Sequence, residues 1–359
     1  MHWHVVRSLL RTYGLRAVLV VVMVLSINDV LAQVKPGTAV AEDQRLLPYA
    51  KPGQLVDIGG RRINLQCTGV GHPTVILMAG IASWSPVWYK TQPVIAKTAR
   101  VCGFDRAGYG FSDPAPRPEI LSDVADDLHA ALKAGSIPAP YVLVGHSLGG
   151  VEARLYAQRW PKEVVGMVLV DTSPAAEGLI DEDQQGFDEV IQRESAVADL
   201  LHCALLAAHG SIEPSSPEYK ECGLALPSGT PAAFRNIVPR FFTSYYFADR
   251  VSLEFSLYTH RYDSVDHRPL GAMPLIVLSP ENAWNTGTPA GIRFRQSYSK
   301  VWIGMHEALA RLSSRGIHRI ITASSHEVQL DQPQAVVDAV EEVLRQLHDG
   351  AKSRDNTTP

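Results

Sequence analysis

The chain has 359 residues, of which 46% are hydrophobic and 19% are charged, and its formal net charge is -4. High apolar content with low net charge excludes disorder over most of the chain, and the lack of a basic excess argues against a nucleic-acid-binding protein. No run of about 18 apolar residues occurs, which excludes a protein with several membrane-spanning helices. The length fits two ordinary domains or one large α/β domain with an insertion.

The first 32 residues have the pattern of an export signal. Three arginines precede nine apolar residues at 17–25, and Val30, Leu31 and Ala32 form a small-residue cleavage pattern. We therefore predict a signal peptide at 1–32 and a secreted or periplasmic protein. The alternative is a membrane anchor, but the apolar run is far shorter than the roughly 20 residues that span a bilayer. Stable membrane insertion after cleavage is not expected.

Residues 33–53 contain several Pro and Gly and are interpreted as a linker. Short, β-branched-rich apolar segments then alternate with helical patterns, as expected for strands that are buried on both faces of a sheet. The strand candidates are 55–57, 63–67, 74–78, 99–104, 141–144, 164–171, 275–279 and 318–322. The helix candidates are 121–134, 148–160, 296–313 and 334–347. This order predicts an α/β fold with an open, mostly parallel, eight-stranded sheet and helices on both faces.

About one hundred residues separate the sixth strand candidate from the seventh. This segment is long enough for a helical insertion, so we predict a cap or lid at 172–272. The core then consists of 54–171 and 273–348, and 349–359 is expected to be a disordered tail.

The strongest chemical signal is the sequence GHSLG at 145–149, which directly follows one strand candidate and directly precedes a helix candidate. This is the context of a nucleophile elbow, in which a serine stands on a tight turn between strand and helix. Glycines flank Ser147 at two residues on each side, where larger side chains would clash. The helix N-terminus adds positive potential. Ser147 is therefore the candidate nucleophile.

A nucleophilic serine needs a base and an acid, which follow it in the order acid, then histidine, in elbow hydrolases. His326 comes a short loop after the last strand candidate and is the predicted base. Asp171 ends the sixth strand, at the same sheet edge, and is the favoured acid; Glu281, after the seventh strand, is the alternative. His146 is interpreted as a structural residue. The histidines interpreted as surface or cap residues are His260, His267 and His306.

The oxyanion hole of such a site needs two backbone N–H groups aimed at the developing charge. One is the N–H of Leu148, the residue after the candidate nucleophile. The other is expected from Ile81, because Gly80 allows a tight turn after the third strand candidate.

In an exported protein, four cysteines indicate disulfides, and three pairings are possible. The pairing that joins sequence neighbours is Cys67–Cys102 and Cys203–Cys222. A metal site that combines Cys203 and Cys222 with nearby histidines (His202, His209) is the rival interpretation, but no C-x-x-C or H-E-x-x-H spacing supports it.

Taken together, these motifs resemble the α/β-hydrolase fold superfamily, in its serine-nucleophile, esterase- and lipase-like branch, over about residues 54–348. The features that carry the resemblance are Gly80, the run at 104–113, the elbow at 145–149, the strand that ends in Asp171, Ser325 with His326, and LDQP at 330–333. The resemblance implies that Asp105, Arg106 and Gly108 brace a loop and do no chemistry. It also makes the second and fourth strands neighbours, which implies a bond between Cys67 and Cys102 and leaves Cys203–Cys222 within the cap.

The sequence departs from common members of this superfamily in two places. Ala79 stands where many have a histidine in the oxyanion loop, and no Asp follows the strand at 275–279. The second departure favours Asp171 as the acid. Serine rather than aspartate at the elbow argues against the dehalogenase and epoxide hydrolase chemistry of some relatives.

The expected function is hydrolysis of a small-molecule carboxylic ester by a Ser-His-Asp acyl-enzyme mechanism, with no cofactor and no metal. The alternatives are an amidase, a lactonase or a C–C bond hydrolase with the same triad, or a catalytically silent binding protein on the same fold. Aromatic residues in the cap could line an apolar pocket or form the core of the cap itself. They are Phe241, Phe242, Tyr245, Tyr246, Phe247, Phe255 and Tyr258. Trp84 and Trp88, after the oxyanion loop, could line the pocket or pack against a helix.

Overall fold

The computed structural model describes residues 41–173, 186–214, 216–224, 226, 228–259, 268–281 and 289–355. The predicted signal peptide at 1–32 lies outside the described residues, as do His260 and His267.

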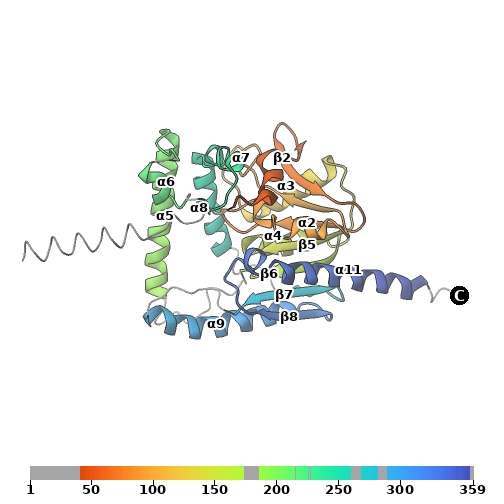
Figure 1. The fold of residues 1–359 in the computed structure, drawn as a ribbon. Helices are drawn as coiled ribbons and strands as arrows, with labels where there is room; N and C mark the ends of the chain where they lie inside the picture. Colours follow the sequence, from red (N-terminus) through yellow and green to blue (C-terminus); the bar gives the residue numbers. More distant parts are fainter. Residues whose placement is uncertain are drawn as a thin grey trace, which may run out of the picture. The chain divides into compact units, whose positions relative to one another are not determined.

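One sheet of eight strands forms the centre of the fold, in the order β1-β2-β4-β3-β5-β6-β7-β8 (Figure 1). The first two pairings, β1 with β2 and β2 with β4, are antiparallel, and the others are parallel. The strands are β1 (Gln54–Asp57), β2 (Arg62–Thr68), β3 (Thr74–Met78), β4 (Val101–Phe104), β5 (Tyr141–His146), β6 (Val164–Val170), β7 (Leu275–Pro280) and β8 (Gly316–Ile321). The predicted eight-stranded, mostly parallel sheet is confirmed.

Helices cover both faces of this sheet. The elements outside the cap are η1 (Gln44–Ala50), η2 (Ser85–Trp88), α2 (Gln92–Ile95), α3 (Leu121–Ala134), α4 (Leu148–Arg159), α9 (Pro289–Ala310), α10 (Val328–Asp331) and α11 (Pro333–Asp355). One apolar cluster joins the sheet to α3, α4 and the end of α9, and another joins its opposite face to α2, α10 and α11. In β3, Ile76 and Met78 belong to the first cluster, and Val75 and Leu77 to the second. This alternation explains why the strand is apolar at every position.

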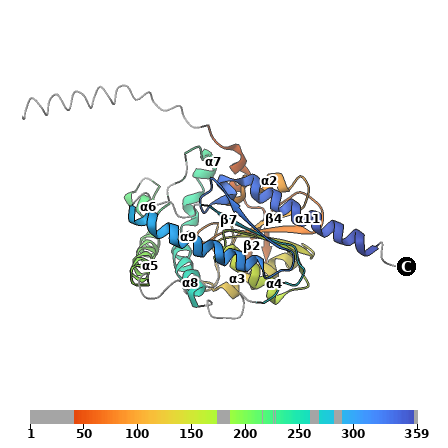
Figure 2. The ribbon, with the colours of Figure 1, turned by 90° about the horizontal axis from the view of Figure 1, so that it is seen from below.

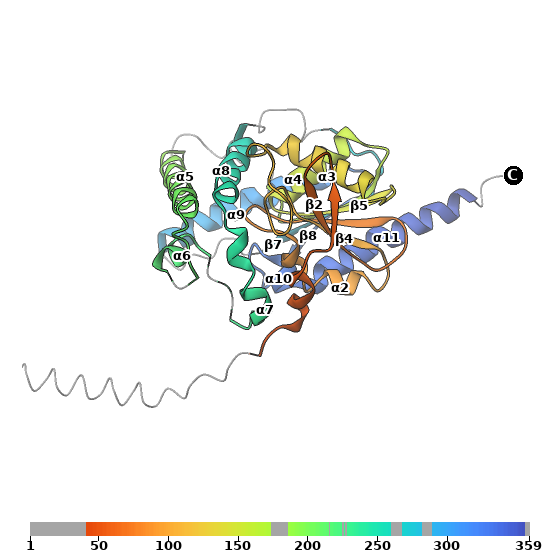
Figure 3. The same ribbon diagram turned by 90° about the horizontal axis from the view of Figure 1, so that it is seen from above.

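A helical cap stands between β6 and β7. Its elements are α5 (Gly186–Ala208), α6 (Pro217–Glu221), α7 (Ala232–Arg235), η3 (Val238–Phe241) and α8 (Ser244–Thr259). The long helices α5 and α8 lie side by side (Figures 1 and 3). Phe242, Tyr246 and Phe247 are buried in one cluster with Tyr109 of the core, so these aromatic residues form the core of the cap and its contact with the sheet domain. Phe255, in contrast, is exposed.

Two disulfides occur, one in each part of the fold. Cys67 of β2 is bonded to Cys102 of the neighbouring β4, and Cys203 of α5 is bonded to Cys222 at the end of α6. These are the pairs that the sequence predicted.

The structure differs from the expectation at both ends of the chain. Part of the expected linker forms η1, because the aromatic ring of Tyr49 is buried and its hydroxyl donates a hydrogen bond to Gln92 Oε1 (2.8 Å). The expected disordered tail is helical as far as Asp355, where α11 ends. Good helix formers, including Ala351, Lys352 and Arg354, outweigh the single Gly350.

Candidate active site

Ser147 stands on the turn between β5 and α4. Its backbone has φ 51° and ψ -121°, a strained conformation for an L-residue, and its N–H donates to Val170 O (3.0 Å). A Cβ on Gly145 would lie 2.4 Å from the carbonyl oxygen of Gly149, so this turn requires a glycine at that position. The elbow predicted from the sequence motif therefore has the backbone shape that such a turn needs.

His326 and Asp171 meet at the same edge of the sheet. His326 Nδ1 lies 2.6 Å from Asp171 Oδ2, and Asp171 is fully buried, whereas 27% of the His326 side chain is exposed. The alternative acid, Glu281, is exposed, and no hydrogen bond or ion pair within the described residues joins it to His326. Of the two candidate acids, the structure brings Asp171 to the histidine.

His146 links the elbow to this pair. Its ring lies 4.6 Å from the ring of His326, centroid to centroid, and its Nε2 lies 3.0 Å from the backbone oxygen of His326. Since a carbonyl oxygen only accepts, Nε2 carries the hydrogen. Burial lowers the pKa of His146 well below its ordinary value, and a charge on His326 lowers it further. His146 is thus a neutral donor that holds the His326 backbone beside Ser147.

Two residues of α9 surround the acid, and the sequence interpretation missed both. Trp302 Nε1 donates a hydrogen bond to Asp171 Oδ1 (2.6 Å). His306 is fully buried rather than a surface residue, and its Nε2 lies 2.7 Å from Thr172 O. Burial lowers the pKa of His306 to about 4. The four-residue spacing, which places both side chains on one helix face, is the signal that could have paired them.

The oxyanion loop that follows β3 packs directly on the elbow. A Cβ on Gly80 would lie 2.8 Å from His146 Nδ1 and 3.2 Å from Ser147 Cβ, so only glycine allows this approach. The next residue, Ile81, is the expected donor of the loop, and the Leu148 N–H is at the first turn of α4. Both expected donors therefore lie on segments that meet at Ser147.

A buried ion pair fixes the oxyanion loop to the nucleophile helix. Arg106 Nη1 donates to Gly80 O (3.0 Å), while Arg106 Nε donates to Glu152 Oε1 of α4 (2.7 Å). Neither side chain of the pair is more than 2% exposed. Arg106 thus braces this loop, as the resemblance implies, and Glu152 is its partner, which the sequence did not reveal. Asp105 accepts from the Ser85 N–H (2.8 Å) and belongs to the same support.

The described residues contain one group of potential metal ligands, formed by His146, His326 and Glu327. One nitrogen of each ring has a hydrogen-bond partner, which is His326 O for His146 Nε2 and Asp171 Oδ2 for His326 Nδ1. The rival metal site in the cap is not formed, because its two cysteines are bonded to each other as Cys203–Cys222.

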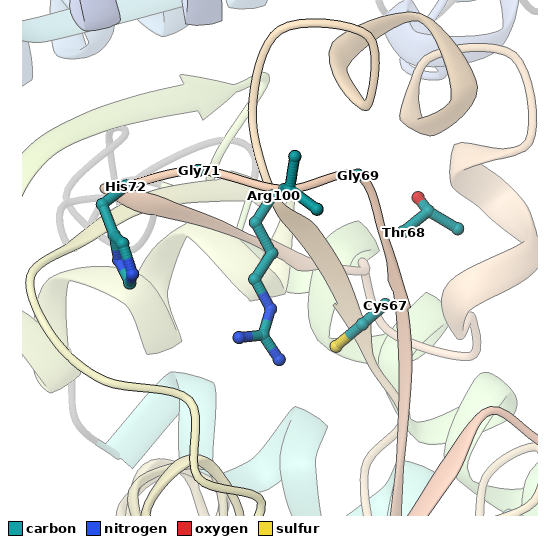
Figure 4. Close-up of a pocket in the computed structure, with 7 residues that line it drawn as sticks. Cys67, Thr68, Gly69, Gly71, His72 and Arg100 are labelled. Carbon is teal, nitrogen blue, oxygen red and sulfur yellow. The ribbon is translucent and has the colours of Figure 1, made fainter.

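A separate pocket of about 270 Å³ lies beside the first disulfide (Figure 4). Its lining residues are Cys67, Thr68, Gly69, Val70, Gly71, His72 and Arg100. Residues 71–72 and Arg100 precede the parallel strands β3 and β4, whereas Ser147 and Asp171 follow β5 and β6. The pocket is therefore at the opposite edge of the sheet from the candidate site.

The comparisons with known proteins agree on the fold. A family model described as alpha/beta hydrolase fold matches residues 73–202. An uncharacterized Bacillus subtilis protein, YbdG, is 32% identical over 123 residues, which are 33% of this chain and 37% of that protein. The chain thus spans little more than a third of this curated relative.

Two solved structures share the architecture over most of the chain. A thermophilic esterase from Thermogutta terrifontis has a TM-score of 0.55 at 19% identity and covers 83% of this chain and 99% of its own. A putative lipase from Acinetobacter baumannii has a TM-score of 0.61 at 15% identity, with 86% and 95% covered. In the part of the chain that the structure describes, no helix is both long and apolar enough to cross a membrane.

Proposed function

We propose that this chain, which has the α/β-hydrolase fold, is a serine hydrolase that cleaves carboxylic esters with Ser147, His326 and Asp171. The observation that carries the proposal is the 2.6 Å contact between His326 Nδ1 and Asp171 Oδ2 beside a strained serine elbow. A buried acid, a partly exposed histidine and a serine on a tight turn are the arrangement that acyl transfer requires.

In the proposed reaction, His326 takes the proton of Ser147 Oγ through Nε2 while the oxygen attacks the ester carbonyl. Asp171 keeps the hydrogen of His326 on Nδ1 and stabilises the imidazolium that forms. His326 then protonates the leaving alcohol, and a water molecule that His326 activates hydrolyses the acyl-enzyme. The N–H groups of Leu148 and Ile81 bind the oxyanion in both steps, where one donor contributes roughly 3 kcal/mol.

Labelling with a fluorophosphonate tests the nucleophile. We expect the wild-type protein to be labelled and Ser147→Ala to remain unlabelled. Ser136→Ala is a matched control, because Ser136 is another serine with positive φ (54°) but lies after α3, outside the site. Equal labelling of wild type and Ser147→Ala contradicts the assignment, and a silent binding protein is not labelled at all.

A substrate panel tests the reaction class. Matched esters, amides and lactones with the same acyl chain are compared by kcat/KM, and we expect the esters to be cleaved fastest. Faster turnover of amides or lactones, with the same dependence on Ser147, would keep the triad and replace the ester assignment.

We also propose that the chain is exported, since disulfides persist in oxidising compartments and this chain has two. Expression with the full N-terminus, followed by mass spectrometry, should give a mature protein that begins at Gln33. An intact N-terminus in the cytoplasm contradicts this proposal.

A further inference from the structure

We propose that Trp302 is a positioning residue for the acid of the triad, and that α9 holds Asp171 in place through Trp302 and His306. This inference rests on the proposed triad. Figures 1 and 2 show α9 running past the sheet beside β7 and β8, from the side of the fold where α5 lies. The helix therefore reaches the edge of the sheet at which Asp171 stands.

The carboxylate of Asp171 has one donor on each oxygen. Trp302 Nε1 donates to Oδ1 (2.6 Å) and His326 Nδ1 lies 2.6 Å from Oδ2. Asp171 is fully buried and Trp302 is 2% exposed. In such a site, removal of one donor leaves a buried, charged oxygen without its partner, so the carboxylate can rotate or lose its alignment with His326.

The backbone around the acid needs support as well. Asp171 has φ 41°, in the left-handed region that L-residues rarely adopt. Its N–H donates to Leu278 O (2.8 Å), and the next carbonyl, of Thr172, lies 2.7 Å from His306 Nε2. The two side chains of α9 thus hold both the carboxylate and the strained turn behind it.

The hydrogen positions in this support follow from the partners. Thr172 O only accepts, so His306 Nε2 carries the hydrogen, and Nδ1 of this neutral ring accepts from Ser279 Oγ (2.5 Å). Ser279 Oγ then accepts from His318 Nε2 (2.7 Å). Ser279 of β7 is consequently engaged with α9, on the strand after which relatives commonly place their acid. In this chain the acid instead follows β6, and the side chains that donate to it and to the turn behind it lie on α9.

Other ionisable groups also face the pair of Asp171 and His326. His146 packs on the His326 ring, and burial raises the pKa of Glu327, the next residue in the chain. His306 Nδ1 lies 4.0 Å from Asp171 Oδ1, and Arg154 donates to Ser173 O (3.0 Å). All of these groups are retained when Trp302 alone is changed, so a shift in the titration of His326 reports on the indole donor.

The first test compares Trp302→Phe with wild type on an ester substrate. We expect kcat to fall roughly 10- to 100-fold, because a hydrogen bond to a charged group is lost, while KM changes less than about twofold. Without the indole donor, the Asp171 carboxylate is no longer held in line with His326 Nδ1 and stabilises the His326 imidazolium less. The acid limb of the pH profile of kcat/KM should therefore move down by roughly 0.5 to 1 pH unit.

Trp88→Phe is the matched control. Trp88 is also fully buried, but its indole N–H has no hydrogen-bond partner within the described residues, and it packs on the face of the sheet covered by α11. The same change in volume there should leave the pH profile unchanged. An equal shift in both variants contradicts the proposal, because it would mean that lost packing alone moves the titration.

A second readout does not depend on turnover. The titration of His326 is followed by NMR of protein labelled with ¹³C-histidine, and His326→Gln assigns the signal. We expect a lower midpoint in Trp302→Phe than in wild type and Trp88→Phe. If the wild-type protein fails to hydrolyse esters, the proposed function fails, yet this titration still decides whether Trp302 controls the pair.

A second variant excludes misfolding and the entry of water as explanations. Site-specific benzothienylalanine at position 302 keeps the shape of tryptophan and replaces the N–H by sulfur. This protein should retain the wild-type melting temperature and show the same downward shift of His326. An unshifted His326 in the benzothienylalanine protein overturns the proposal.

Discussion

The carboxylates of Asp171 and Glu281 differ in burial and in partners. Asp171 is fully buried between His326 and Trp302, whereas Glu281 is exposed. We expect Asp171→Asn to lower kcat by roughly 10⁴-fold, because the amide favours the wrong tautomer of the histidine. Glu281→Gln should stay within about twofold of wild type. Measurement of kcat on a p-nitrophenyl ester checks both, and a large loss only in Glu281→Gln would overturn the assignment.

A stability measurement tests the neutral state of His306. Burial lowers its pKa from about 6.5 to about 4, so between these pH values the unfolded chain binds a proton that the folded chain does not. Stability should therefore fall as the pH falls from 6.5 to 4, by about 3 kcal/mol for this group. His306→Gln keeps a donor and an acceptor but does not titrate.

The free energy of unfolding, from urea titrations at pH 7 and pH 4.5, gives the comparison. The pH-dependent loss should be smaller in His306→Gln than in wild type. Identical losses in the two proteins would show that His306 does not remain neutral in the fold.

At the scale of single residues, the sequence predicted the residues that stand in chemical motifs but not the side chains that hold the site in place. Ser147 and His326 stand in recognisable contexts, a glycine-flanked turn and a loop after the last strand. Trp302 and His306 lie on α9 and Glu152 lies on α4, and the contacts that these side chains make around the site arise only from tertiary packing. The four-residue spacing of Trp302 and His306 places both on one helix face, but the sequence does not say which residues that face contacts.

At the scale of the elements, side chains along α8 of the cap form hydrogen bonds with the backbone where α3 of the core begins. Asp249 Oδ1 accepts from the Glu119 N–H (2.6 Å), and Ser256 Oγ accepts from the Leu121 N–H (3.1 Å). The first N–H groups of a helix have no partner within it, so a side chain that accepts from them stabilises the start of α3. Tyr245 adds a hydrogen bond to Arg117 O (3.2 Å). The cap helix therefore supplies part of the N-terminal capping of a core helix.

Glu119, just before α3, should make the stability of the protein fall as the pH rises. Burial, and after it the nearby Asp127 carboxylate, raise the pKa of Glu119 to about 10. The folded chain holds a proton on Glu119 that the unfolded chain releases above about 4.5. The contribution of this group to stability should therefore fall as the pH rises from 5 to 9.

Melting temperatures between pH 5 and pH 9 check this expectation. Glu119→Gln, a neutral replacement, should be more stable than wild type at pH 8 and should lose less stability as the pH rises. Glu281→Gln serves as the exposed control and should follow wild type. A Glu119→Gln protein with the wild-type slope contradicts the inferred protonation.

Elements with strong local patterns were predicted well. β3 and α3 have the predicted bounds, and the predicted strands at 55–57 and 63–67 are each extended by one or two residues in β1 and β2. The start of α9 at Pro289 and the end of α11 at Asp355 were placed wrongly. The residues by which α9 and α11 exceed the predicted helices lack an amphipathic pattern that would have placed the helix ends. Helix propensity and tertiary contacts determine where these two helices start and stop.

Over the whole molecule, contacts join the cap to the core at several points. Tyr246 of α8 donates to Ala82 O of the oxyanion loop (3.0 Å), Ser256 accepts from the first N–H of α3, and Asp249 accepts from the N–H of Glu119 just before that helix. The buried aromatic cluster extends from the cap to Tyr109 of the core. These links favour one cooperative unfolding transition for cap and core, rather than a cap that unfolds first.

The two disulfides test this cooperativity, because one lies in each part. Cys67–Cys102 closes a separation of 35 residues, and Cys203–Cys222 one of 19. From the entropy of the closed loops, removal of Cys67–Cys102 should lower the free energy of unfolding by about 4 kcal/mol and removal of Cys203–Cys222 by about 3 kcal/mol.

Double alanine variants of each pair, and the quadruple variant, are compared by urea unfolding followed with two optical probes. If cap and core unfold together, the two losses add in the quadruple variant and the probes coincide. If removal of Cys203–Cys222 shifts only an early, separate transition, cap and core do not unfold together. The contacts of α8 with α3 would then be too weak to join the two parts.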